Sequence, residues 1–464
     1  MNIRLSITIL ITKIAIKFLR LTRSGGTTLP GKIALKLYPD IASVISKDFN
    51  IIMVTGTNGK TTTTRIIGQM LSENSIPYIT NKSGANLVSG VISTFIESVD
   101  INGRCDAKTA LIEIDEAAFK AISSLIKPNF LVVTNFFRDQ LDRYGELYST
   151  LNGVREGILK SKHTKLILNA DDSLCASLGK DTGNETVYFG MSETAIKEPI
   201  EALSQDAVFC IYCKEKYVYK SRVYGHLGSF ACPGCGYSRP KPSITCESVI
   251  KLTSAFSDIV YTVPSVDGTS SYSAKINLPG LYNVYNALAA ASLGFLLDLP
   301  QDKTIKALES FECGFGRMET INIGNKFIKL ILVKNPTGFN QVLNYLVTDD
   351  KKMQLAFAIN DNYADGTDIS WLWDVDFEKL EEYQDQMVNI YTSGTRAEDM
   401  SVRLKYAGIF SDRITTLKDY KELIREGISK TDEGECFYIL PTYTAMLDIR
   451  KILSSMYNLK EFWK

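Results

Sequence analysis

The chain has 464 residues, 45% of them apolar, and this length predicts more than one hydrophobic core and two or three domains. Lysine plus arginine and aspartate plus glutamate number 52 each, so the overall charge gives no reason to expect bulk nucleic-acid binding. Nine cysteines are too few for a disulfide scaffold, and four of them form one paired cluster, which favours a reducing compartment, the cytoplasm, and a metal site.

Residues 1–48 precede the first predicted strand and contain the apolar segment SITILITKIAIKFLRLT. Lys13, Lys17 and Arg20 interrupt this segment at helical spacing, so neither a membrane span nor a signal peptide is predicted. The pattern predicts an amphipathic helix. Two roles stay open for it: packing on the protein's own surface, or lying on anionic lipid at the inner face of the membrane.

Two stretches of alternating apolar and helical segments follow. Residues 49–311 contain the apolar runs FNIIMV, TALIEID, FLVVTN and KLILNA, which predict a parallel α/β sheet. From about 205 to 242 the composition changes to a Cys-, Tyr- and Gly-rich insert. Residues 312–464 contain FIKLILV, QLAFAIN, MVNIYTSG and CFYILPTY, which predict a second, Rossmann-like α/β domain.

A phosphate-binding loop is predicted at VTGTNGKTTTT, between the first strand and the first helix of this alternation. Glycines let the backbone amides face an anion, lysine adds a positive charge, and a threonine hydroxyl can ligate Mg²⁺. The general P-loop pattern requires glycine where Val54 stands, so the match is to a shorter loop. The residues predicted to bind ATP are Gly56, Thr57, Asn58, Gly59, Lys60, Thr61 and Thr62.

The octet TGTNGKTT resembles that of the Mur ligase family, ATP-dependent enzymes of peptidoglycan precursor synthesis with folate-ligating relatives. LIEID, TNFFRDQLDRYGE, LNADD, GLYNVYNALAA and GRMET match further motifs of that family in order. The resemblance implies that Glu113, or alternatively Glu116, holds Mg²⁺. It also implies that Asn286 contacts ATP and that Arg317 contacts its phosphates.

Two departures from the family pattern concern a second metal ion. Gln140 stands where the family has a histidine, and no lysine occurs between Phe130 and Leu159, where many members have a carbamylated lysine. The family uses this equipment to position an acyl phosphate for attack by an amino acid. We therefore expect phosphorylation of a carboxylate without addition of an amino acid.

The insert contains a zinc-ribbon pattern in which two C-x₂-C pairs are separated by 18 residues. Four thiolates close a tetrahedral site and leave no position for water, so a structural Zn²⁺ is expected rather than a catalytic one. A ribbon that binds nucleic acid is the alternative, but the insert has no long basic run. The predicted ligands are Cys210, Cys213, Cys232 and Cys235.

An aspartate-rich segment, NDNYADGTDISWLWDVDFE, lies at 360–378. Together with the zinc ribbon it resembles one branch of the Mur ligase family, in which the ligase chain pairs with a GatD-like class I glutamine amidotransferase. The resemblance implies ATP-dependent amidation of the D-glutamate α-carboxyl in the lipid II stem peptide to D-isoglutamine, with ammonia from the partner. It further implies that an aspartate of the C-terminal domain, Asp368 or otherwise Asp365, orients the partner's catalytic histidine.

The chain itself offers no glutaminase centre. Neither His163 nor His226 lies in a catalytic motif, and no cysteine has the context of a glutaminase nucleophile. The alternative within enzymes is a stand-alone Mur or folylpolyglutamate-type ligase that joins an amino acid. Activity with an amino acid and without a glutaminase distinguishes that alternative.

Overall fold

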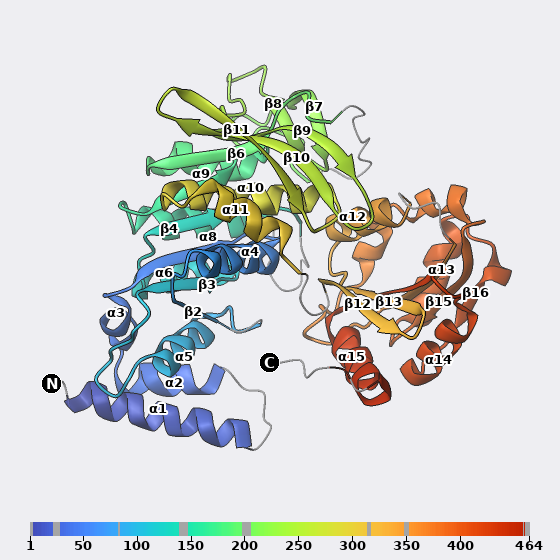
Figure 1. The fold of residues 1–464 in the computed structure, drawn as a ribbon, viewed down its shortest axis with the longest axis horizontal. Helices are drawn as coiled ribbons and strands as arrows, with labels where there is room; N and C mark the ends of the chain where they lie inside the picture. Colours follow the sequence, from blue (N-terminus) through green and yellow to red (C-terminus); the bar gives the residue numbers. More distant parts are fainter. Residues whose placement is uncertain are drawn as a thin grey trace.

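Two α/β units lie side by side in the protein (Figure 1). The structure, a computed structural model, describes residues 3–21, 28–81, 84–138, 147–196, 206–312, 317–347, 352–457 and 459. A nine-stranded sheet forms the first unit and a six-stranded sheet the second. The predicted α/β fold with two alternating regions is confirmed.

The nine-stranded sheet has the order β11-β10-β9-β6-β5-β4-β1-β3-β2. Its strands run parallel from β2 to β9, and β9, β10 and β11 pair antiparallel. The strands are β1 (Asn50–Thr55), β2 (Tyr78–Thr80), β3 (Thr109–Glu113), β4 (Phe130–Val133), β5 (Lys165–Asn169), β6 (Thr186–Met191), β9 (Ile244–Leu252), β10 (Ser257–Ser265) and β11 (Gly268–Ile276).

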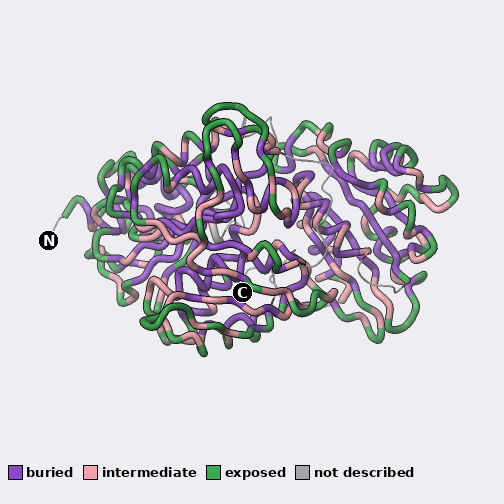
Figure 2. The backbone as a smooth tube through the Cα atoms, turned by 90° about the horizontal axis from the view of Figure 1, so that it is seen from above, coloured by how far each residue is buried: buried purple, intermediate pink, exposed green. Residues whose placement is uncertain are grey.

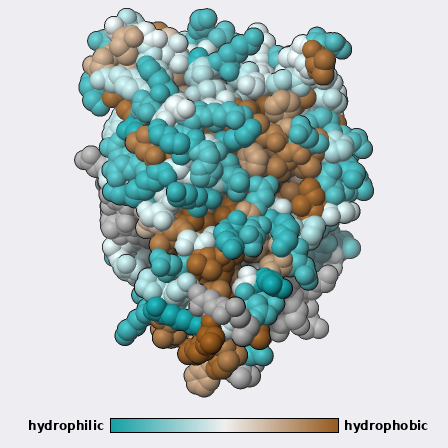
Figure 3. Space-filling model, turned by 90° about the vertical axis from the view of Figure 1, so that its left-hand side faces the viewer, coloured by the Kyte–Doolittle hydropathy of each residue, from teal (hydrophilic) through white to brown (hydrophobic). Residues whose placement is uncertain are grey.

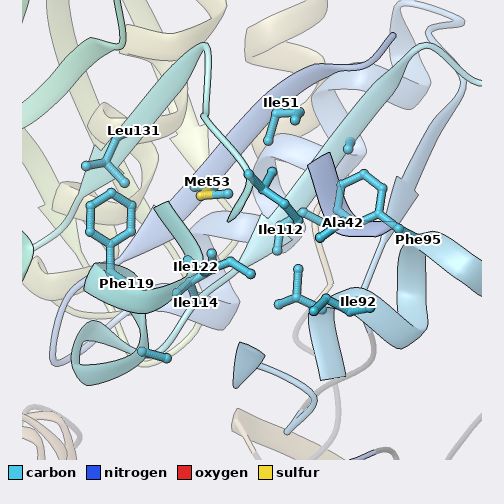
Figure 4. Close-up of a cluster of buried hydrophobic side chains, with 14 of the residues drawn as sticks. Ala42, Ile51, Met53, Ile92, Phe95, Ile112, Ile114, Phe119, Ile122 and Leu131 are labelled. Carbon is cyan, nitrogen blue, oxygen red and sulfur yellow. The ribbon is translucent and has the colours of Figure 1, made fainter. Parts of the chain in front are cut away.

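Helices cover both faces of this sheet, which is why β1 is an almost continuous apolar run. Alternate residues of β1 enter opposite cores: Ile51 and Met53 face one cluster, Ile52 and Val54 the other. Figure 4 shows the first cluster between the strands and the helices α5 and α6. The helices are α4 (Lys60–Glu73), α5 (Val88–Ser98), α6 (Glu116–Leu125), α8 (Leu147–Leu159), α9 (Ser173–Thr182), α10 (Leu281–Leu296) and α11 (Gln301–Glu309).

Three helices precede the sheet: α1 (Ile3–Leu21), α2 (Thr28–Leu37) and α3 (Ile41–Ser46). They lie at one end of the first unit, beside α5 (Figure 1). The predicted N-terminal helix is thus present. Across the described ranges, none of the helices has the length and apolarity needed to span a bilayer.

The six-stranded sheet has the order β12-β13-β17-β14-β15-β16 and is parallel except for β12. Two clusters of buried hydrophobic residues pack on this sheet, and buried residues run through the interior of both units (Figure 2). The strands are β12 (Arg317–Ile323), β13 (Lys326–Ile331), β14 (Met353–Ala358), β15 (Met387–Ser393), β16 (Ile414–Thr416) and β17 (Cys436–Pro441). The helices are α12 (Pro336–Leu346), α13 (Ala397–Tyr406), α14 (Tyr420–Lys430) and α15 (Tyr443–Tyr457), with 3₁₀ turns η1 (Ser370–Asp374), η2 (Phe377–Tyr383) and η3 (Ser411–Arg413).

The cysteine-rich insert forms a small separate module on the first unit. Its two strands, β7 (Val218–Tyr224) and β8 (Leu227–Ala231), make an antiparallel hairpin. A small cluster of buried aromatic residues, including Tyr217, Phe230 and Tyr237, packs around Cys210 and Cys232.

Candidate active site

The phosphate loop joins β1 to α4 in the predicted strand–turn–helix order. Gly56 and Gly59 have φ angles of 125° and 84°, in the region that favours glycine. A Cβ atom on Gly59 would lie 2.1 Å from Asn286 Oδ1, and one on Gly56 would lie 2.3 Å from Thr134 Oγ1. Conformation and space therefore both require glycine here, and the loop directs the N-terminus of α4 to the carboxyl edge of the sheet.

Lys60, the first residue of α4, is buried inside the loop. Its Nζ donates to Glu116 Oε2 at 2.7 Å and to the Gly56 carbonyl at 2.6 Å. Burial alone would lower the pKa of Lys60, but the negative charges of Glu116, Asp115 and Glu113 raise it. Lys60 is therefore a fixed, protonated cation in the loop. Sequence reasoning did not foresee that Glu116 is its ion-pair partner.

Polar atoms that face the loop have the chemistry of a phosphate and Mg²⁺ site. Asn58 Nδ2, Thr61 Oγ1 and Thr64 Oγ1 are buried without a hydrogen-bond partner in the described part of the chain. Glu113 ends β3 and pairs with Val54 of β1, two residues before the loop; it is buried, and its carboxylate has no ion pair among the described residues. Because Mg²⁺ prefers carboxylate and hydroxyl oxygens, Thr61 and Glu113 fit that ion better than Glu116, which Lys60 engages.

Asn286 lies against the phosphate loop, beside Gly59. It is carried by α10, and its Oδ1 accepts a hydrogen bond from Thr63 Oγ1 at 3.2 Å. Its Nδ2 donates to Asn283 Oδ1 at 3.0 Å. Arg317 is the first residue of β12, and its side chain lies outside the described parts of the chain, as does Gln140.

A cleft opens beside the loop, between the two units. The first unit lines it with Asn58, Gly59, Thr62, Asn286 and the aromatic side chains of Phe137, Tyr224 and Tyr282, and the second with residues of β13 and α12. Asn335 caps α12 by accepting from the Gly338 N–H, and its Nδ2 donates to Asn58 Oδ1 at 3.0 Å. This contact across the cleft was not predicted. The only local indication in the sequence was the pair Asn335-Pro336, which is typical of the start of a helix.

The four predicted zinc ligands converge. All four Sγ atoms lie within 4.8 Å of one another; those of Cys213 and Cys232 are 3.3 Å apart, and those of Cys210 and Cys235 are 3.6 Å apart. Tetrahedral thiolates at a Zn–S distance of about 2.3 Å would be separated by about 3.8 Å. Each C-x₂-C turn is followed by a residue with left-handed backbone, Lys214 (φ 67°) and Gly236 (φ 74°), so the two turns have matching geometry. The donor set therefore fits a structural Zn²⁺.

Two aspartates were predicted as candidates to act across an interface, and the carboxylate of one of them, Asp365, is hydrogen-bonded within the chain. Asp365 is buried, and its carboxylate accepts hydrogen bonds from the Thr444 N–H, at 2.7 Å, and the Thr444 hydroxyl. Burial raises the pKa of Asp365, although these hydrogen bonds act in the opposite direction. This aspartate ties the loop after β14 to the start of α15.

Asp368 is exposed at the surface of the second unit. One oxygen accepts a hydrogen bond from the Ser370 N–H at 2.8 Å, which fixes the carboxylate at the start of η1. No partner of the other oxygen lies among the described residues. Nearby, Trp373 is 55% exposed and packs edge-on against Tyr406, itself 75% exposed. Asp368 does not line the cleft beside the phosphate loop.

Comparison with known proteins agrees with this arrangement. Residues 54–228 match the family described as "Mur ligase middle domain" and residues 332–446 the family described as "MurT ligase C-terminal". A pseudomurein peptide ligase type C from Methanothermus fervidus has a TM-score of 0.65 at 22% identity, over 92% of this chain and 84% of that one. The MurF ligase from Thermotoga maritima in complex with ADP has a TM-score of 0.62 at 14% identity, over 91% and 84%. The fold is therefore that of the Mur ligases.

Comparison with curated relatives identifies the family within the Mur ligases to which the chain belongs. The chain is 35% identical over 437 residues to "Lipid II isoglutaminyl synthase (glutamine-hydrolyzing) subunit MurT" of Streptococcus pneumoniae, covering 94% of each chain. It is 33% identical over 450 residues to the same subunit of Staphylococcus aureus strain COL, covering 97% of each chain. The chain belongs to the MurT family.

Proposed function

We propose that the chain is the synthetase subunit of a glutamine-hydrolysing lipid II isoglutaminyl synthase. The α-carboxylate of the D-glutamate residue in the stem peptide takes the γ-phosphoryl group of ATP, giving an acyl phosphate and ADP. Ammonia then adds to the acyl carbon, and phosphate leaves, so the carboxyl becomes the amide of D-isoglutamine. The observation that carries this proposal is the similarity to MurT subunits, which are 33–35% identical to the chain over 94–97% of its length.

The phosphate loop would bind and polarise the nucleotide. Lys60 and the first N–H groups of α4 would neutralise the charge on the phosphates. Asn286 would contact ATP and Arg317 its phosphates, as the family resemblance implies. Thr61 and Glu113 would hold Mg²⁺, which supplies further charge neutralisation when bound. The buried Lys60–Glu116 pair keeps the lysine charged and positioned in the loop.

Domains 49–311 and 312–464 would divide the work. The first carries the nucleotide site and a structural Zn²⁺ held by the four cysteines of the insert, about 205–242. The second would receive a GatD-like class I glutamine amidotransferase, and Asp368 would orient its catalytic histidine. Exposure and a fixed carboxylate support Asp368 for this role, whereas the Thr444 hydrogen bonds of Asp365 support a structural one.

A surface for the membrane that carries lipid II is provided by α1. Six large apolar side chains project from one face of this helix and are 41–67% exposed: Ile3, Ile7, Leu10, Ile11, Ile14 and Phe18. Their spacing follows the helical repeat, and the opposite face, with Leu5 and Ile9, is buried. Figure 3 shows apolar surface at the lower end of the molecule, where Figure 1 places α1.

The charge around this face suits anionic lipid. Residues 1–39 contain seven lysines and arginines and no aspartate or glutamate, although the whole chain carries 52 of each sign. Lys17 is exposed, whereas Lys13 donates to the Glu97 and Val99 carbonyls at the end of α5 and so is used within the protein. A basic, apolar-faced helix of this kind lies in the interface plane of a bilayer.

The function is tested by amidation of lipid II in the presence of ATP, Mg²⁺, glutamine and a class I glutaminase partner. Mass spectrometry should detect the amide in place of the acid, together with ADP. The reaction should also proceed when glutamine is omitted and ammonium salt is added as the source of ammonia. Attachment of an amino acid in place of ammonia would instead establish a stand-alone ligase.

The membrane surface is tested by sedimentation with vesicles that contain anionic lipid. Ile14→Glu with Phe18→Glu should lower the bound fraction severalfold, while Val266→Glu, at a fully exposed apolar residue in the β10–β11 turn, should leave it unchanged. Equal binding of both variants would exclude α1 as the contact.

A further inference from the structure

The cysteine-rich module, residues 206–242, touches the nucleotide cleft at the turn of its hairpin. Gly225 and His226 form this turn between β7 and β8. A Cβ atom on Gly225, whose φ is 56°, would lie 2.9 Å from Phe137 Cε1, so the turn sits directly on the Phe137 ring. His226 is 1% exposed, with its ring centroid 4.6 Å from that of Phe137.

The hairpin also delivers an aromatic ring into the cleft. Tyr224 lines the cleft and stacks nearly parallel on Phe137, with centroids 5.9 Å apart and ring planes 16° apart. Phe137 is in turn fixed to the phosphate loop, because its N–H donates to Thr57 Oγ1 at 3.1 Å and its carbonyl accepts from the same hydroxyl at 3.2 Å. A continuous row of contacts therefore runs from the phosphate loop to the module.

Two adjacent aspartates of the LNADD segment, Asp171 and Asp172, contact the residues of this row. Asp172 is fully buried; its Oδ1 lies 3.3 Å from His226 Nε2, and its Oδ2 accepts from the Phe136 N–H at 2.7 Å. The Asp171 carbonyl accepts from the Gly228 N–H at 2.9 Å. Asp172 thus contacts both the hairpin turn and the segment that carries Phe137.

The Asp171 side chain links the far end of the module to α10. Its Oδ1 accepts from Arg239, which follows the second cysteine pair, and its Oδ2 accepts from the Tyr285 hydroxyl at 2.6 Å. Tyr285 directly precedes Asn286, which contacts the phosphate loop. Tyr285 also packs edge-on against Tyr224, with centroids 5.9 Å apart.

We infer that the cysteine-rich module is a wall of the nucleotide site and that nucleotide affinity depends on its being folded. Tyr224 is a positioning residue against which the base of the nucleotide packs, and Asp171 and Asp172 hold it in place. This inference rests on the proposed binding of ATP. Aromatic faces bind nucleotide bases by stacking, and the cleft presents Tyr224 and Phe137 at the side of the phosphate loop.

Calorimetric titration with Mg²⁺ and ADP tests the inference in the full chain. Tyr224→Leu should raise the dissociation constant about three- to tenfold through loss of the aromatic face. The matched control is Phe209→Leu, which changes an exposed aromatic residue of the same module that does not line the cleft and should bind ADP as the wild type does. Cys232→Ser should lower both the zinc content and the ADP affinity, with the two sheets still folded by circular dichroism.

The outcomes separate this inference from the proposed function. Loss of ADP binding in Lys60→Ala together with unchanged affinity in Tyr224→Leu and Cys232→Ser would overturn the role of the module and leave the function standing. A wild-type chain that binds no ADP would overturn both. Weaker binding in Tyr224→Leu but not in Phe209→Leu supports the inference.

Discussion

Lys60 of the phosphate loop and Asp368 of the aspartate-rich segment differ in whether their charge has a partner among the described residues. Lys60 is buried and paired with Glu116 at 2.7 Å, so the charge of this site is balanced within the chain. Asp368 is exposed and fixed through one oxygen only, to the Ser370 N–H. The first site is neutralised within the chain, whereas one oxygen of Asp368 has no partner among the described residues, which is why we propose this carboxylate for contact with another protein.

A large loss of amidation, whatever the source of ammonia, is expected at the phosphate loop. Lys60→Ala should lower amidation by about 10³-fold or more, because a preorganised charge on the transferring phosphoryl group is lost. It also leaves Glu116 buried without its partner, which should lower the free energy of unfolding. Amidation assays and thermal unfolding measure the two effects separately.

A double variant controls for the stability change. Adding Glu116→Gln to Lys60→Ala removes both charges and should recover stability while the protein stays inactive. Substantial amidation by this double variant would contradict the role of Lys60 at the phosphates.

A comparably large effect is expected at Asp368, in the partner's reaction. Asp368→Asn should lower glutamine hydrolysis by the complex by about 10⁴-fold, the loss measured when a histidine-orienting aspartate becomes asparagine in a serine protease. Asp374→Asn alters another exposed aspartate of the same segment and should retain normal hydrolysis. Equal losses in both variants would indicate a general defect in docking.

A moderate effect is expected where the second unit holds the aspartate-rich segment in shape. Arg403 is 3% exposed and donates to the carbonyls of Leu372 and Val375, at 3.2 Å and 2.7 Å. Arg403→Met removes these two hydrogen bonds and the ion pair with Glu378, and it should reduce stability by about 1–3 kcal/mol in chemical denaturation. An unchanged unfolding midpoint would show that η1 does not depend on this residue.

The smallest effect is expected for the surface ion pair of Asp361 and Arg396, in which Oδ2 and Nη2 are 2.6 Å apart. The Thr395 hydroxyl and Arg396 lower the pKa of Asp361 below its ordinary value, although its slight burial opposes this shift. The contribution of the carboxylate to stability is therefore present above pH 4 or so and is lost as the pH falls through the folded-state pKa. Asp361→Asn should lower the melting temperature slightly at pH 7 and not at about pH 2.

Local signals explain which features were predictable. The phosphate loop, the strand before it and the two C-x₂-C pairs each lie within a few residues, so spacing and residue type identify them. The contacts of Asn335 with Asn58 and of Asp171 with Tyr285 join residues 277 and 114 positions apart. Such pairings depend on how the two sheets and the insert pack, and no short pattern contains them.

The burial of Asp365 and the exposure of Asp368 likewise could be seen only in three dimensions. Both stand in the same short segment, and only packing against Thr444 distinguishes the buried one from the exposed one. The pairing of Lys60 with Glu116 was hidden for the same reason, since Glu113 and Glu116 are three residues apart.

The division between the two sites is tested most directly by supplying ammonia in two ways to the Asp368→Asn complex. Amidation of lipid II would be measured with glutamine and, separately, with a high concentration of ammonium salt, alongside Lys60→Ala. Asp368→Asn should lose the glutamine-driven reaction and keep the ammonium-driven one, whereas Lys60→Ala should lose both. Loss of ammonium-driven amidation in Asp368→Asn, with glutamine hydrolysis intact, would place Asp368 in the synthetase site and contradict its assignment to the partner's chemistry.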